Sequence, residues 1–128
     1  MSALSFTLIS RRTLLAGTSA LLFAGLPSAE ALAHAEFKAS TPVANSVGAP
    51  PTSVTITFSE DISLKFSGAT ITGPEKATVK TGLASLGDSA TLVVPIIDAL
   101  KPGKYTVSWH NLSTDGHKLT GSFAFNVK

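Results

Sequence analysis

The chain has 128 residues, of which 44% are apolar, and its 10 lysines and arginines against 8 acidic residues give a net charge of +2. It contains no cysteine, which excludes disulfides and every thiolate-based site or reaction. The lysines are scattered singly rather than in runs, so the basic patch that nucleic-acid binding requires is not expected. This length allows one small domain with a modest core.

Residues 1–33 have the pattern of a cleavable export signal. Paired arginines at Arg11 and Arg12 precede an apolar run from Leu14 to Leu26, and a small-x-small cleavage site follows at Ala31-Leu32-Ala33. The apolar run is shorter than the roughly 20 residues that a membrane-spanning helix needs. We therefore expect export, cleavage after Ala33 and a soluble mature protein. The paired arginines resemble a twin-arginine signal, although the ordinary secretory route remains open.

Cleavage after Ala33 would make His34 the first residue of the mature chain. His34 would then carry a free amine beside its imidazole, and the two nitrogens could chelate one cation. Nitrogen ligands in a tetragonal plane favour Cu(II). The only methionine is Met1, which leaves with the signal, so the mature chain has no sulfur ligand of the kind that Cu(I) prefers.

Residues 34–128 predict a single all-β domain. Val54, Ile56 and Phe58 alternate with threonines, as in a half-buried strand, and Tyr105 and Trp109 lie on the same face of a later strand and are expected in the core. About seven short strands without an amphipathic helix predict an antiparallel, immunoglobulin-like or Greek-key sandwich. The expected strands cover residues 35–40, 53–59, 69–72, 77–80, 90–94, 104–110 and 118–127.

The tripeptide Asp115-Gly116-His117 lies between the last two expected strands. Its glycine can adopt a backbone conformation closed to other residues, which would let a carboxylate and an imidazole turn toward one point. The alternative is a solvated turn beside an incidental histidine, because Asp-Gly is a common turn dipeptide. His110 is expected at the surface or in a loop rather than as a third ligand.

The mature sequence resembles the CopC family of periplasmic copper-resistance proteins over essentially all of residues 34–128. The resemblance rests on His34-Ala-Glu, Ser40-Thr-Pro, the segment from Val54 to Glu60, and the C-terminal segment from Asp115 to Val127. It implies a small β-sandwich that binds Cu(II).

The family site implies a role for each matching residue. His34 would supply its amine and imidazole, His117 a second imidazole and Asp115 a carboxylate, with Glu60 close by as a weaker ligand or supporting group. Asp61 stands where the family often has proline, which leaves open whether Glu60 or Asp61 faces the metal. Family members with a second, methionine-rich Cu(I) site are a poor guide here, because no methionine remains.

The resemblance predicts a Cu(II)-binding protein that is not an enzyme. It would sequester copper or pass it to an inner-membrane copper transporter of the CopD type, and the sequence leaves detoxification and supply equally open. One alternative is a copper-dependent oxidative enzyme, since lytic polysaccharide monooxygenases also bind copper through an N-terminal histidine. A domain of this size has little room for their flat substrate face. The other alternative is a structural sandwich without a metal.

Overall fold

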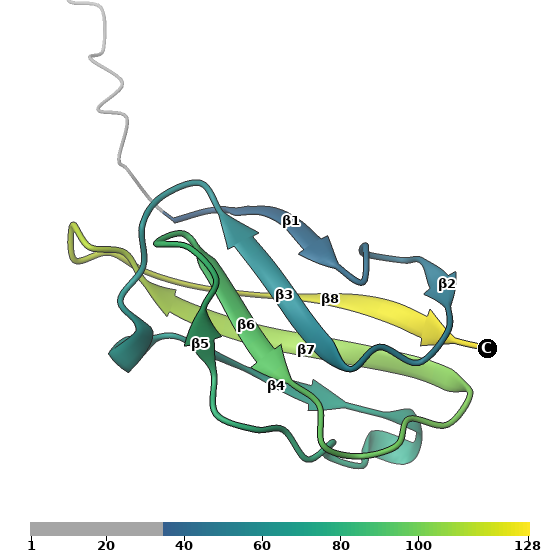
Figure 1. Cartoon of the computed structure of the whole chain (residues 1–128). Coiled ribbons are helices and arrows are strands. Elements are labelled where there is room, and N and C mark those ends of the chain that lie inside the picture. The colour runs from purple at the N-terminus through teal and green to yellow at the C-terminus, as the bar shows by residue number, and fades with distance from the viewer. Residues whose placement is uncertain (1–34) are drawn as a thin grey trace, which may run out of the picture. The chain divides into compact units, whose positions relative to one another are not determined.

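The computed structural model describes residues 35–128, which form a sandwich of two four-stranded sheets (Figure 1). The expected signal peptide, residues 1–33, and His34 lie outside the described residues. One sheet has the order β1-β3-β6-β5, with β1 Phe37–Thr41, β3 Ser53–Phe58, β6 Thr91–Pro95 and β5 Ser85–Leu86. The other has the order β2-β8-β7-β4, with β2 Val47–Gly48, β8 Lys118–Val127, β7 Gly103–Leu112 and β4 Gly68–Thr72. Two 3-10 turns, η1 Leu64–Phe66 and η2 Pro74–Lys76, lie on either side of β4.

Alternating side chains build the core between the two sheets. In β3, Val54, Ile56 and Phe58 are buried, while the residues between them are only half-buried. Because side chains alternate between the two faces of a strand, this pattern directs one face of β3 into the sandwich. In β7, Tyr105 and Trp109 are buried on the inward face, which confirms the prediction that both belong to the core.

Aromatic contacts join the sheets across this core. The Trp109 ring meets Phe58 edge-on, with ring centroids 5.1 Å apart, and stacks against Phe37 at 6.4 Å. Farther along the sandwich, Tyr105 stacks on its cross-strand neighbour Phe125 at 5.5 Å. Such pairs prefer these edge-on and offset arrangements, which fix the relative placement of the strands that carry them.

The predicted all-β sandwich is confirmed, with three differences in its strands. Residues 77–80 form no strand and contribute only an isolated bridge between Thr72 and Thr78. Two strands were missed, β2 and β5, each only two residues long. The described residues therefore contain eight strands rather than seven. Pairing is antiparallel except between β2 and β8, which run parallel.

The topology brings three distant segments to one end of the sandwich. β7 ends and β8 begins there, and a bridge between Ile62 and Ser113 ties the chain after β3 to the β7–β8 connection. The chain enters β1 at the same end, as Figure 1 shows. This end therefore holds the start of the described chain beside the loop that contains Asp115 and His117. Within the described residues, no helix is long and apolar enough to cross a membrane.

Gly121 should be essential for packing around Trp109. A Cβ added at Gly121 would lie 2.4 Å from Cζ2 of Trp109, whose ring is held by Phe37 and Phe58 and cannot move aside. We expect Gly121→Ala to lower the free energy of unfolding by about 1–3 kcal/mol, measured by urea denaturation. The matched control is Gly48→Ala, because nothing lies within 4 Å of its added Cβ; its effect should stay within about 0.5 kcal/mol. Equal effects of the two substitutions would contradict this account of the core.

Candidate metal centre

A short, tightly bonded loop carries the two candidate ligands between β7 and β8. Ser113 N–H donates to the carbonyl of His117 at 2.8 Å, and Gly116 N–H donates to the carbonyl of Ser113 at 2.9 Å. Gly116 has φ +94°, a conformation that side chains with a Cβ rarely adopt. The predicted strand-to-strand corner is therefore present, and its glycine has the role that the sequence indicated.

Asp115 and His117 lie side by side on this loop. Oδ1 of Asp115 is 3.0 Å from Nδ1 of His117, and the two side chains are 37% and 42% exposed. Nδ1 of His117 is shielded from solvent, so this edge of the ring faces the protein. Two ligands in adjacent positions around an ion with bonds near 2.0 Å are about 2.8 Å apart. The observed separation therefore suits a carboxylate and an imidazole on one cation, as well as a simple hydrogen-bonded pair.

Ser113 orients the carboxylate of this pair, and the sequence reasoning missed it. Its hydroxyl group donates to Oδ1 of Asp115 and also accepts a hydrogen bond from the N–H of His117 at 3.2 Å. The Ser113 hydroxyl, followed by the neighbouring His117, lowers the pKa of Asp115 below its ordinary value. Asp115 is therefore anionic at neutral pH. The burial of Ser113 and its contact with Asp115 depend on how the strands pair, so the sequence held no signal for this role.

The segment after β3 contacts the same loop, but its two acidic residues behave differently. The carbonyl of Asp61 accepts a hydrogen bond from Thr114 N–H at 3.0 Å, whereas its carboxylate accepts one from the Ser89 hydroxyl at 2.6 Å. The carboxylate of Asp61 is thus bound by a hydroxyl group of the turn between β5 and β6. Glu60 is exposed, and its carboxylate has no hydrogen bond or ion pair within residues 35–128. This contrast favours Glu60 as the residue able to approach a metal.

The described part of the chain contains only part of a metal site. No group of three or more His, Cys, Asp or Glu residues in positions 35–128 is arranged to hold a metal ion. Asp115 and His117 come together, Glu60 lies on a segment hydrogen-bonded to their loop, and His34 lies outside the described residues.

The chain start is fixed beside these residues. Ala35 is fully buried, and its carbonyl accepts a hydrogen bond of 2.8 Å from the side-chain amide of Asn111 near the end of β7. Glu36 and Ser59 exchange two hydrogen bonds, Glu36 N–H to the Ser59 hydroxyl at 3.0 Å and Ser59 N–H to the Glu36 carbonyl at 2.8 Å. These contacts tie residues 35 and 36 to both sheets.

His110 occupies a different face of the molecule. It alternates with the inward-facing Trp109 and Asn111 on β7 and is itself exposed. Its ring lies across β4, where a Cβ added at Gly68 would be 3.1 Å from its Cε1. It lines a shallow hollow whose neighbours include Lys65 and Phe66, on the outer face of the sheet. This placement agrees with the expectation that His110 is a surface histidine.

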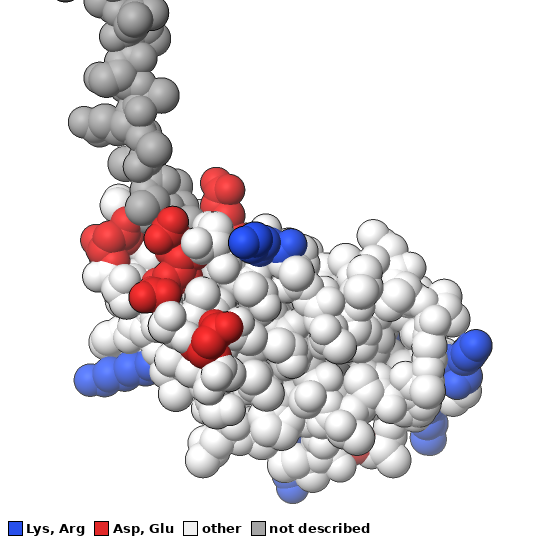
Figure 2. Space-filling model, turned by 45° about the horizontal axis from the view of Figure 1, so that its top comes forward, with Lys and Arg blue, Asp and Glu red and all other residues white. Residues whose placement is uncertain are grey.

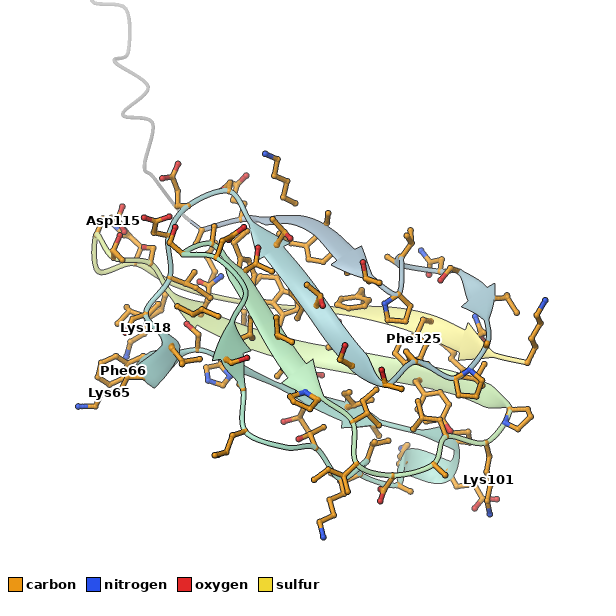
Figure 3. The ribbon with its side chains drawn as sticks, in the orientation of Figure 1. Lys65, Phe66, Lys101, Asp115, Lys118 and Phe125 are labelled. Atoms are coloured by element: carbon orange, nitrogen blue, oxygen red, sulfur yellow. The ribbon has the colours of Figure 1, made fainter. Side chains whose placement is uncertain are left out.

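Acidic side chains gather around the candidate centre, as Figure 2 shows at one end of the molecule. Hydrogen bonds already connect the Glu36, Glu60-Asp61 and Asp115 segments there, and Figure 3 shows Asp115 at the tip of the β7–β8 loop. Charges within about 8 Å of one another still interact at physiological ionic strength. The combined negative charge should attract a cation and favour its higher oxidation state.

Removing the Ser113 hydroxyl should release the carboxylate of Asp115. We expect Ser113→Ala to raise the pKa of Asp115 toward its ordinary value of 3.8, because the largest cause of its depression is then absent. A depressed carboxyl pKa stabilises the fold above pH 3.8 and loses this effect as pH falls through the lower folded-state value. NMR titration of the Asp115 carboxyl carbon in the metal-free protein measures the shift.

Ser89→Ala is the control, since that hydroxyl bonds Asp61 instead, and it should leave the pKa of Asp115 unchanged. An unchanged Asp115 pKa in Ser113→Ala would contradict the assigned role of Ser113.

Comparison with known proteins identifies the family. The family model described as CopC domain matches residues 37–128. Protein YobA of Escherichia coli K12 is 45% identical over 112 residues, covering 85% of this chain and 90% of its own. Copper resistance protein C of Pseudomonas syringae pv. tomato is 39% identical over 110 residues, covering 80% and 87%. The crystal structure of PcoC, a methionine-rich copper resistance protein from Escherichia coli, superposes with a TM-score of 0.70 at 35% identity, over 75% of this chain and all of PcoC. The chain therefore belongs to the CopC family.

Proposed function

We propose that the mature chain is a periplasmic Cu(II)-binding protein that sequesters or carries copper. The ligands would be the amine and imidazole of His34, the carboxylate of Asp115 and the imidazole of His117, with Glu60 nearby. The observation that carries the proposal is the 3.0 Å separation of Asp115 and His117 beside the fixed chain start at Ala35. Consecutive Cα atoms are about 3.8 Å apart, so a ligand residue bonded to the fixed Ala35 would be within reach of the end of β7.

The ligand count suits Cu(II). His34 offers two nitrogens, and the Asp115–His117 pair offers one nitrogen and one oxygen in adjacent positions, which together complete a tetragonal plane. Glu60 would remain as a weaker fifth group. PcoC, a relative of this chain, is methionine-rich by its title, whereas the only methionine of this chain is Met1. The site we propose therefore favours Cu(II) over Cu(I).

The surroundings support binding rather than catalysis. An ionised Asp115 and the acidic end of the sandwich should stabilise the oxidised ion, which opposes the reduction that oxygen-activating copper enzymes require. Two of the relatives named above are copper resistance proteins by their names. Export and cleavage after Ala33, and transfer to an inner-membrane transporter of the CopD type, complete the proposal.

A comparison of two histidines tests the proposal. In protein that begins at His34, His117→Ala should weaken Cu(II) binding by more than about 100-fold, because a direct ligand should matter more than the 10–100-fold typical of supporting groups. His110→Ala is the matched control and should change the affinity by less than about 3-fold, since His110 lies on the outer sheet face. Competition titrations with a chelator of known affinity measure both.

The same titrations with Zn(II) test the metal preference. Binding of Zn(II) as tight as that of Cu(II) would contradict the assigned metal, because divalent affinity normally peaks at copper. A larger loss at His110 than at His117 would show that the site lies elsewhere.

A further inference from the structure

We propose that Asn111 is a positioning residue that holds His34 against the Asp115–His117 pair, its amide N–H fixing Ala35 and its amide oxygen accepting a hydrogen bond from residue 34. The inference rests on the proposed function and deepens it, because it names the group that places the N-terminal ligand. Asn111 itself would not touch the metal.

Asn111 is an unusual residue for its place in the fold. It continues the inward-facing row of β7 after Val107 and Trp109, and only 2% of its surface is exposed. An amide buried among apolar side chains is costly unless both its N–H and its carbonyl group find partners. A leucine would fill the same row without that cost, so the amide at this position needs a specific explanation.

The amide nitrogen of Asn111 has a hydrogen-bond partner within the described residues. Nδ2 of Asn111 donates to the carbonyl of Ala35 at 2.8 Å, across 76 positions of sequence. Ala35 is fully buried, and Glu36 is held to Ser59 by two hydrogen bonds. The chain is thus fixed at Ala35 from the β7 side and at Glu36 from the β3 side.

The amide oxygen of Asn111 still needs a hydrogen-bond donor. Oδ1 of Asn111 is buried and has no hydrogen-bond partner among residues 35–128. Turning the amide over would place this oxygen against the Ala35 carbonyl, so the contact with Ala35 fixes the orientation of both ends. The nearest chain beyond the described residues is His34, which is bonded directly to Ala35. A donor on residue 34 would satisfy the oxygen.

The N-terminal amine can make this bond while it binds a metal. A neutral amine coordinates through its lone pair and keeps its N–H groups, so one of them can donate to Oδ1 of Asn111. A hydrogen bond from a metal ligand to a fixed acceptor orients the ligand and raises its basicity. Asn111 would then orient the amine of His34 through a hydrogen bond, as Ser113 orients the carboxylate of Asp115. Both residues lie at the end of β7 and both are 2% exposed.

A double-mutant cycle tests the inference. Asn111→Leu removes both hydrogen-bonding groups at similar volume, and it is measured in protein that begins at His34 and again in protein that begins at Ala35. We expect a loss of Cu(II) affinity of about 10–100-fold in the first background and less than about 2-fold in the second, because the amine and imidazole that Asn111 would hold in place are then absent. Ser108→Ala, on the exposed face of the same strand, is the control and should have no effect in either background.

The outcomes separate the two proposals. Equal losses in both backgrounds would overturn the inference, because Asn111 would then act through the fold or the loop rather than through His34. Full affinity in Asn111→Leu would overturn it as well and would leave the copper site intact. No Cu(II) binding by the unmodified protein would overturn the proposed function itself. If Asn111→Leu does not fold, Asn111→Ala replaces it in the same cycle, with the same expected losses.

Discussion

The long antiparallel ladder between β7 and β8 determines where the candidate metal centre lies. It pairs residues from Gly103 with Val127 to Leu112 with Lys118, so the loop between the strands has one possible position at the end of the sandwich. Five residues then remain to turn the chain, and backbone bonds across Ser113, Gly116 and His117 hold them. The loop is consequently held to the end of the sandwich by several hydrogen bonds, as the pair of ligands that we propose would require.

The end of β7 also places the start of the described chain, at Ala35, beside the β7–β8 loop. The inward face of β7 is apolar through Trp109 and becomes polar at Asn111 and Ser113. One of these residues contacts Ala35 and the other contacts Asp115. The polar end of an otherwise apolar row thus links the two parts of the chain from which we propose that the copper ligands come. Buried polar groups of this kind are costly unless satisfied, and here they determine the local geometry.

Residue patterns predicted the fold where the strands are long enough to show a period. The alternation at 53–58 and at 104–110 predicted β3 and β7, because each has one face in the core. The two-residue strands β2 and β5 have no period to detect. Residues 77–80 were predicted to be a strand, but after η2 they make only an isolated bridge to β4 and single hydrogen bonds between Lys80 and residues 97–98. The structure of these segments is determined by tertiary contacts rather than by the local sequence pattern.

The candidate site was predictable in part. The tripeptide Asp115-Gly116-His117 predicted a turn. In the structure, Oδ1 of Asp115 lies 3.0 Å from Nδ1 of His117. Asn111 and Ser113 could not be assigned from sequence, because their partners, Ala35 and Asp115, depend on strand register rather than on composition. The roles of His34 and Glu60 remain predictions.

The most direct test of the account concerns the amine of His34. Cu(II) affinity is measured for protein that begins at His34 and for protein that begins one residue earlier, at Ala33. The extension turns the nitrogen of His34 into an amide without a basic lone pair while leaving every side chain in place. The account predicts that the extended protein binds Cu(II) at least about 100-fold more weakly, more than a supporting group would contribute. Equal affinities would contradict it, because the N-terminal nitrogen would then be no ligand.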